Sequence, residues 1–139
     1  MTNKELIAEA KKARERAYCP YSHHSVGAAL LTKKGKIYHG CNVENSAYGP
    51  TNCAERTAFF TAVCDGEREF SKIAIVGGMD DTDGSKPCAP CGVCRQVMAE
   101  FCDPKEFRII LANGDEEPLE FTLEEMLPMG FFPSNLSAL

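Results

Sequence analysis

The sequence predicts an α/β fold in which a mixed five-stranded sheet carries helices on its faces. Segments with apolar residues at helical spacing alternate with short, apolar, β-branched segments of strand length. Their order is helix, two strands, helix, strand, helix, two strands and a short helix, which favours a mixed sheet between helices. The chain has 139 residues, of which 44% are hydrophobic and 25% charged, as is typical of one globular domain. We therefore expect a single domain over residues 1–139.

The first helix is predicted over roughly residues 3–17, where apolar residues recur at helical spacing. Thr2 or Asn3 can cap its start, because a short polar side chain can accept a hydrogen bond from the first turn. Pro20 disfavours helix in the residue before it and sets a limit to the end. The helix should therefore end shortly before this proline.

A β-hairpin is predicted next, formed by the apolar runs Val26–Leu31 and Ile37–Val43. The basic stretch Lys33–Lys36 lies between them and is interpreted as a solvated turn. Three further strands and three further helices are then expected. The predicted helices cover Cys53–Cys64, Pro90–Phe101 and Thr122–Leu127, and the predicted strands cover Lys72–Val76, Phe107–Leu111 and Leu119–Phe121.

Local signals mark the ends of these later helices. Asp65-Gly66 ends the helix that begins near Cys53, and Pro90 suits the first turn of the next one. Thr122 and Glu125 match a capping box at the start of the short last helix. Both cysteine-rich motifs of the chain therefore lie where a loop enters a helix.

Charge and composition exclude several classes of protein. The formal net charge of −5 argues against binding nucleic acid through its phosphates, and a small substrate is expected instead. No segment is long and apolar enough to span a bilayer, and the N-terminus does not resemble a secretion signal. The eight cysteines are then expected as reduced thiols or metal ligands in a cytoplasmic protein.

The motifs Cys53-Ala54-Glu55 and Pro90-Cys91-Gly92-Val93-Cys94 provide three thiolates and one carboxylate. Cys91 and Cys94 are three residues apart, so they share one face of a helical turn and can bind the same ion. A catalytic zinc keeps one position open for water and needs a proton carrier nearby. Glu55 is the candidate carrier, and the motifs indicate a catalytic zinc site.

The position of Cys53 relative to Glu55 restricts the geometry of such a site. In a regular helix the two side chains would point about 200° apart, so both face one metal only if Cys53 lies at the helix entrance. Free N–H groups and the positive end of the helix dipole lower the pKa of a thiol at that place. Arg56 is placed to donate hydrogen bonds to the sulfurs and to offset the charge of three thiolates.

Other interpretations of the cysteines stay open at this stage. Cys88 forms a second Cys-x-x-Cys with Cys91, so it could be a fourth ligand that closes the site into a structural zinc centre, and a redox dithiol is a further alternative. The remaining cysteines are expected to be buried apolar residues, namely Cys19, Cys41, Cys64 and Cys102.

These residues resemble the cytidine deaminase family, in particular its small type with three cysteine ligands that acts on free nucleosides. The resemblance covers nearly the whole chain, through these segments: Tyr21-Ser22, Val26–Leu30, Gly40–Asn45, Cys53–Ala58, Pro90–Gln96, Leu127-Pro128 and Phe131. It implies a three-layer sandwich with the mixed sheet in the middle. It also implies one zinc ion per subunit and hydrolytic deamination of cytidine and 2′-deoxycytidine in pyrimidine salvage.

The resemblance assigns roles to individual residues. It implies that Cys53, Cys91 and Cys94 hold Zn²⁺, that an activated water attacks C4 of the cytosine ring, and that Glu55 moves the protons. Asn42 and Glu44 would hold the ribose hydroxyls. The backbone of Ala54 and Cys91 would contact the edge of the base, and Arg56 would lie behind the metal ligands. Without the resemblance, Asn42 and Glu44 would be polar residues on the solvated face of a strand.

Three aromatic or imidazole side chains complete the expected site. Tyr48 and Phe131 match positions that line the active site of a neighbouring subunit in the family, so the resemblance implies a homotetramer with shared active sites. By composition alone Phe131 would be an ordinary core or interface residue. His24 stands where family members usually have a phenylalanine that packs on the base. Its neutral imidazole could stack in the same way, or the residue could be an exposed polar residue of a loop.

Overall fold

The computed structural model describes residues 1–136 and contains one mixed sheet in the strand order β2-β1-β3-β4-β5. Neighbouring strands are antiparallel except β3 and β4, which are parallel. The strands are β1 (His24–Thr32), β2 (Ile37–Cys41), β3 (Phe70–Met79), β4 (Arg108–Leu111) and β5 (Leu119–Thr122). The helices are α1 (Asn3–Arg14), α2 (Ala54–Cys64), α3 (Gly92–Phe101), α4 (Leu123–Met126) and the 3₁₀ helix η1 (Pro133–Leu136).

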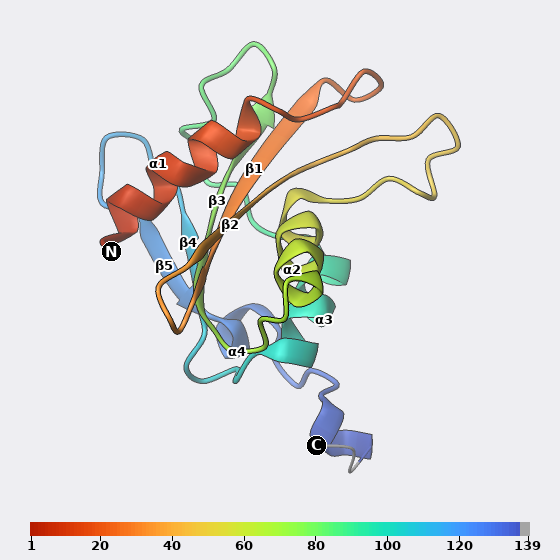
Figure 1. Cartoon of the computed structure of the whole chain (residues 1–139). Coiled ribbons are helices and arrows are strands. Elements are labelled where there is room, and N and C mark those ends of the chain that lie inside the picture. Colours follow the sequence, from red (N-terminus) through yellow and green to blue (C-terminus); the bar gives the residue numbers. More distant parts are fainter. Residues whose placement is uncertain (137–139) are drawn as a thin grey trace.

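Helices cover both faces of this sheet, as Figure 1 shows, so the predicted three-layer arrangement is confirmed. On one face, α1 buries Leu6, Ile7 and Ala10 against alternate residues of β1, β3 and β4. On the other face, α2, α3 and α4 bury a larger cluster that includes Phe59, Met98 and Leu123. Side chains alternate between the two faces along each strand, so the central strands need apolar residues at nearly every position.

The first helix begins as predicted but is shorter than predicted. The Thr2 hydroxyl accepts a hydrogen bond from the Glu5 N–H, and the Glu5 carboxylate accepts one from the Thr2 N–H, which forms a capping box. The predicted end near residue 17 is wrong, because α1 ends at Arg14. The N–H groups of Arg16 and Ala17 donate hydrogen bonds to the carbonyls of Ala13 and Arg14, three residues back, so the turn after the helix is tighter than an α-helical turn.

The second strand of the hairpin also ends earlier than predicted, at Cys41 and not at Val43. The side-chain amide of Asn42 accepts a hydrogen bond from the Val26 N–H at 2.9 Å and donates one to the His24 carbonyl at 2.8 Å. It thus occupies backbone groups of β1 that the continuing ladder would use. Val43 forms only isolated bridges, to Tyr18 and Asn52.

The prediction that both cysteine motifs stand at helix starts is confirmed. Cys53 is the N-cap of α2 and Cys91 is the N-cap of α3, and both have extended backbone conformations. Gly40 lets α2 approach β2 closely, since a Cβ atom there would lie 2.2 Å from the Ala54 carbonyl oxygen. The start of α2 is therefore held directly on the sheet.

Two long connections bring the remaining residues to these helix starts. Residues 42–53 join β2 to α2, and Figure 1 shows this connection extending well away from the sheet. Residues 80–91 join β3 to α3 and return from the far end of β3. Within residues 1–136, the helices are too short or too polar to cross a membrane.

Candidate active site

Three thiols from two helix starts meet in one cluster. The sulfur atoms of Cys53, Cys91 and Cys94 all lie within 4.8 Å of one another, and those of Cys53 and Cys91 are 3.9 Å apart. Cys91 and Cys94 come from the first turn of α3, where the Cys94 N–H also donates to the Cys91 sulfur at 3.4 Å. The predicted ligand set is therefore assembled from segments 38 residues apart in the sequence.

The spacing of these sulfurs fits a zinc ion. Thiolates bound to zinc at about 2.3 Å in a tetrahedral arrangement lie roughly 3.8 Å apart. The Cys53 to Cys91 separation of 3.9 Å matches this value. Thiolate sulfur is also the donor type that zinc prefers in proteins. Three sulfurs leave one tetrahedral position for another ligand.

Arg56 lies behind the cluster, as predicted. Its Nη2 atom donates a hydrogen bond to the Cys53 sulfur at 3.1 Å. Its Nε atom is buried and has no hydrogen-bond partner among the described residues. Because a guanidinium ion stays charged at all ordinary pH values, this side chain places a fixed positive charge next to an anionic ligand set.

Hydrogen bonding shifts the pKa values of two of the thiols in opposite directions. Hydrogen bonds from Cys94 and Arg56 lower the pKa of Cys53 to about 5, with the Arg56 charge acting in the same direction. The hydrogen bond to Cys53, together with burial, raises the pKa of Cys94. In the absence of metal at neutral pH, Cys53 is therefore a thiolate that accepts a hydrogen bond from the Cys94 thiol.

Glu55 lies in the first turn of α2 and is only 4% exposed. Burial raises the pKa of its carboxyl to about 7, and the neighbouring Cys53 thiolate contributes in the same direction. A carboxyl that titrates near neutral pH can both accept and donate a proton there. The side chain thus has the property that a proton carrier needs.

A cavity of about 350 Å³ opens beside Glu55. This size is within the range of small-molecule sites. We call it the base cavity; its lining residues are Ser22, His24, Val26, Asn42, Glu44, Thr51, Asn52, Cys53, Ala54, Glu55, Cys88, Ala89 and Cys91. Seven of the predicted site residues are among them, so the predicted ligands, carrier and substrate contacts converge on one hollow.

Asn42 and Glu44 lie at one side of the base cavity but beyond the end of β2. The Glu44 carboxylate accepts hydrogen bonds from the N–H groups of Tyr21 and Ser22 at 2.9 and 3.1 Å, and from the Ser22 hydroxyl at 2.5 Å. The Ser22 hydroxyl, followed by these backbone groups, lowers the pKa of the Glu44 carboxyl. The carboxylate is therefore held rigidly, with lone pairs left for a ligand.

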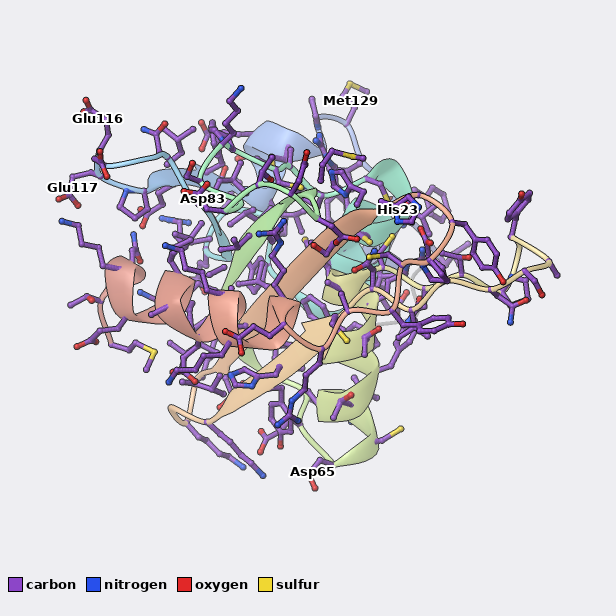
Figure 2. All side chains as sticks on the ribbon, turned by 90° about the horizontal axis from the view of Figure 1, so that it is seen from above. His23, Asp65, Asp83, Glu116, Glu117 and Met129 are labelled. Atoms are coloured by element: carbon purple, nitrogen blue, oxygen red, sulfur yellow. The ribbon has the colours of Figure 1, made fainter. Side chains whose placement is uncertain are left out.

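His24 is half-buried in the wall of the base cavity, whereas its neighbour His23 is exposed. His23 has a φ of 58°, in the left-handed region that residues other than glycine seldom adopt. Its carbonyl accepts a hydrogen bond from the Asp80 N–H, and its N–H donates to the Cys19 carbonyl. Figure 2 shows His23 on this turn. The turn separates the two imidazoles, so the alternative of an exposed loop residue does not hold for His24.

Cys88 is not part of the thiol cluster, which contains Cys53, Cys91 and Cys94 alone among the described residues. It lines the base cavity instead and is half-buried there. Burial raises the pKa of its thiol, and the nearby Glu55 carboxylate acts in the same direction. The alternative of a closed site with four cysteine ligands therefore finds no support in the geometry.

The other cysteines follow the expectation of burial only in part. Cys19 and Cys102 are buried as predicted, whereas Cys41 is half-buried. The prediction for Cys64 is wrong, since it is exposed. Cys64 is the last residue of α2, where the helix leaves the sheet and its outer face turns to solvent.

Tyr48 and Phe131 do not line the base cavity of this chain. Tyr48 lies on the extended 42–53 connection, is 73% exposed and contacts Tyr21 edge to face. Phe131 lies in the C-terminal segment and is 57% exposed. Its carbonyl accepts a hydrogen bond from the Gln96 side chain of α3.

Several residues of the site were not singled out from the sequence. Ser22, which fixes Glu44, belongs to a motif that resembles the family but was given no role. Thr51 and Asn52 line the base cavity directly before Cys53, and Ala89 does so directly before Pro90. Their closeness to the cysteine motifs is the only sequence signal that could have marked them.

Comparisons with known proteins agree with this geometry. Residues 1–110 match the family described as cytidine and deoxycytidylate deaminase zinc-binding region. A cytidine deaminase from Sporosarcina psychrophila is 55% identical over 137 residues, which cover 99% of this chain and 96% of the relative. One from Halalkalibacterium halodurans is 47% identical, with 99% of each chain covered. The crystal structure of cytidine deaminase from Burkholderia pseudomallei superposes with a TM-score of 0.85 at 49% identity, covering 94% of this chain and all of that one.

Proposed function

The chain belongs to the cytidine and deoxycytidylate deaminase family, and from this premise we propose that it hydrolyses cytidine and 2′-deoxycytidine to uridine and 2′-deoxyuridine. The observation that carries the proposal is a cluster of three thiols that opens, through Cys53 and Cys91, on the same cavity as the buried Glu55. This combination provides a metal ligand set with one open position, a proton carrier and room for a small ring. The enzyme is a zinc hydrolase of the C–N bond at C4.

Cys53, Cys91 and Cys94 would hold the zinc ion. When bound, zinc acts as a Lewis acid that makes a water molecule nucleophilic at neutral pH. Arg56 donates a hydrogen bond to the Cys53 sulfur and draws negative charge away from the ligand set. The three thiolates then weaken the Lewis acidity of the zinc less than they would without Arg56.

Glu55 carries protons in both directions. It accepts a proton from the attacking water and transfers it to ring N3 while the new C4–O bond forms. It then accepts the remaining hydroxyl proton and delivers one to the amino group as the C4–N bond breaks. Water and cytidine thus become uridine and ammonia, with no other reactant. Its pKa, raised to about 7 by burial before metal binds, supports this double role.

The walls of the base cavity hold the nucleoside. The carboxylate of Glu44 and the amide of Asn42 would bind the ribose hydroxyls, and both are fixed by hydrogen bonds to neighbouring backbone. The backbone of Ala54 and Cys91 would contact the base edge beside the sulfurs. His24 would stack on the base in place of the phenylalanine that is usual in the family.

Two exposed aromatic residues support a shared site in a homotetramer. Tyr48 and Phe131 leave large apolar surfaces open to solvent in the isolated chain. Aromatic side chains are enriched in protein–protein interfaces. We infer that these two side chains complete the active site of a neighbouring subunit, and that the enzyme works in cytoplasmic pyrimidine salvage.

The direct test is to incubate the purified, zinc-loaded protein with cytidine and to follow the loss of ultraviolet absorbance as uridine forms. Steady loss of absorbance with release of one ammonia per uridine is expected. No change with protein shown to contain one zinc per chain would overturn the proposed function. A polynucleotide cytosine is the matched comparison, and it should not react, because the Glu44 carboxylate at the ribose repels a 3′ phosphate.

A further inference from the structure

The Glu44 carboxylate lies against a turn of the chain, which we call the 19–23 turn. The N–H groups of Tyr21 and Ser22, in the middle of this turn, donate to the same carboxylate oxygen at 2.9 and 3.1 Å. Two consecutive backbone N–H groups of this kind form a small nest for an anion. The orientation of the Glu44 carboxylate therefore depends on the position of the 19–23 turn.

The hydroxyl of Ser22 completes this nest. It accepts a hydrogen bond from the His24 N–H at 3.1 Å and donates one to the second oxygen of Glu44 at 2.5 Å. Because the His24 N–H approaches a lone pair of the hydroxyl, the hydroxyl proton is directed to the carboxylate. The 19–23 turn thus fixes both oxygens of Glu44.

Asp80, the residue directly after β3, holds the 19–23 turn at both of its ends. Its N–H donates to the His23 carbonyl at 2.7 Å, and its carboxylate accepts a hydrogen bond from the Cys19 thiol, with sulfur to oxygen distances of 3.5 and 3.7 Å. The His23 N–H also donates to the Cys19 carbonyl at 3.0 Å, which closes the turn. Figure 2 labels His23 at the end of this turn.

The thiol of Cys19 is the stronger of two side-chain contacts to the Asp80 carboxylate. Cys19 is buried, and burial raises the pKa of its thiol to about 11, with the Asp80 carboxylate acting in the same direction. The thiol therefore keeps its proton at neutral pH and can donate a hydrogen bond. The His23 imidazole lies 3.9 Å from the same carboxylate and is 66% exposed, so it adds little.

Backbone hydrogen bonds hold the residue before the 19–23 turn to the segment that carries Glu44. The Tyr18 N–H donates to the Asn42 carbonyl at 2.9 Å, and the Glu44 N–H donates to the Tyr18 carbonyl at 2.8 Å. These bonds do not involve the side chains of Asp80 and Cys19. Loss of either side chain should therefore shift the nest around Glu44 while the two segments stay paired.

We propose that Asp80 and Cys19 are positioning residues for the ribose, which act on the Glu44 carboxylate through the 19–23 turn. This inference rests on the proposed function, in which Glu44 binds the ribose hydroxyls. Neither Asp80 nor Cys19 lines the base cavity. The effect of removing their contact should then depend on whether the nucleoside carries a hydroxyl group for Glu44 to bind.

The test compares cytidine with 2′,3′-dideoxycytidine, which lacks both ribose hydroxyls and whose affinity is measured as a competitor of cytidine turnover. Cys19→Ala and Asp80→Ala should each raise KM for cytidine about three- to tenfold, as expected for the loss of one hydrogen bond. In both variants, kcat and the affinity for the dideoxy compound should stay within about twofold of the parent values. Equal losses for both nucleosides, or no rise in KM for cytidine, would overturn the inference. A zinc-loaded parent protein that does not convert cytidine would instead contradict the proposed function.

Further variants separate positioning from a general effect on the fold. Cys19→Ser keeps a donor for Asp80 and should restore KM to within about twofold of the parent value. The double variant Cys19→Ala/Asp80→Ala should raise KM no more than the larger single change, and multiplied effects would contradict a shared contact. Asp80 is 49% exposed, so Asp80→Ala tests the same contact if Cys19→Ala does not fold. Asp81→Ala, at the exposed next residue, and Cys102→Ala, at a buried thiol of α3, are the matched controls and should behave as the parent.

Discussion

The starts of α2 and α3 bring thiols to the same metal position, but they are built differently. At the start of α2 a single ligand, Cys53, is followed by the buried Glu55 and by Arg56, which donates to the Cys53 sulfur. At the start of α3 there are two ligands, and the N-cap Cys91 is exposed and accepts a hydrogen bond from the Cys94 N–H. In the proposed mechanism, one helix start thus carries the proton chemistry and the charge compensation, and the other carries most of the metal binding.

Metal affinity and catalysis can therefore be separated in this site. Replacement of Glu55 at α2 should remove turnover while zinc stays bound, whereas replacement of a ligand at α3 should remove zinc itself. Helix dipoles stabilise thiolates at both helix starts, so the dipoles do not explain why the two starts differ. The difference comes from the side chains in the first turn of each helix.

The largest effect on turnover is expected for Glu55→Gln at the start of α2. The amide keeps the size of the side chain but cannot carry a proton, so kcat should fall by about 10³ to 10⁴ while one zinc per chain remains. Steady-state kinetics together with metal analysis measure both quantities. Glu125→Gln, at an exposed capping box far from the site, is the matched control. Full activity in the Glu55 variant would show that Glu55 at the start of α2 does not carry the protons.

A complementary loss is expected for Cys94→Ala at the start of α3. Removal of one of three thiolates should lower zinc content below one per chain, and activity should fall in proportion to the metal lost. Cys102→Ala, which replaces a buried cysteine at the other end of the same helix, should keep its zinc. Zinc analysis after dialysis against a weak chelator distinguishes the two variants. Equal retention of zinc in both would contradict the assignment of the ligands.

A smaller effect is expected for Arg56→Gln. Loss of the guanidinium should lower kcat or zinc affinity by about 10- to 100-fold. It should also raise the pKa of Cys53, which the parent protein holds at about 5. The direction of the change in proton release on zinc binding follows from this pKa. Because Cys53 is already ionised at pH 7 in the metal-free parent, zinc binding should release fewer than three protons from the three ligands, and the variant should release more.

Calorimetry of zinc binding at pH 7 in buffers of different ionisation enthalpy counts these protons. Arg56→Lys is the conservative comparison, because it keeps the positive charge but has a different hydrogen-bond geometry. It should lie between the parent and the glutamine variant. Three protons released by the parent would show that Cys53 carries its proton and that Arg56 has no part in its ionisation.

The smallest effect is expected at the ribose side of the cavity. Hydrogen bonds from Ser22 and the adjacent backbone hold the pKa of Glu44 below its usual value, so its carboxylate form persists as the pH falls. KM should rise only when the pH falls through that lowered pKa. In Ser22→Ala the pKa moves up, so the rise in KM should begin at a higher pH. A pH profile of KM for cytidine between about 3.5 and 7 tests this. An unchanged profile in the variant would show that Ser22 does not lower the pKa of the Glu44 carboxyl in the enzyme.

The sequence predicted the features that depend on local signals. The helical spacing after Cys53 placed the start of α2, and the capping-box pattern at Thr122 placed the last helix. Pro90 marked the start of α3 two residues too early, because the helix begins at Gly92 with Cys91 as its N-cap. The ends of α1 and β2 were predicted too late. The end of β2 depends on the Asn42 side chain, which bonds to backbone of β1 16 to 18 residues away in the sequence, and no local pattern reveals that contact.

The sequence likewise predicted only part of the candidate site. Spacing alone brought Cys91 and Cys94 together, but the same Cys-x-x-Cys spacing also fits Cys88, and only the folded loop separates it from the cluster. A second cavity of about 560 Å³, lined by the end of β3 and the loop that follows it, was not predicted at all, because a void has no signature in the order of residues.

We expect the two helix starts together to form an open zinc site with three sulfur ligands. X-ray absorption spectroscopy of the zinc-loaded protein counts the sulfur and lighter atoms around the metal directly. Three sulfurs at about 2.3 Å and one oxygen are predicted, and the oxygen shell should change when a nucleoside is added. Four sulfurs, with no change on addition of nucleoside, would contradict the account.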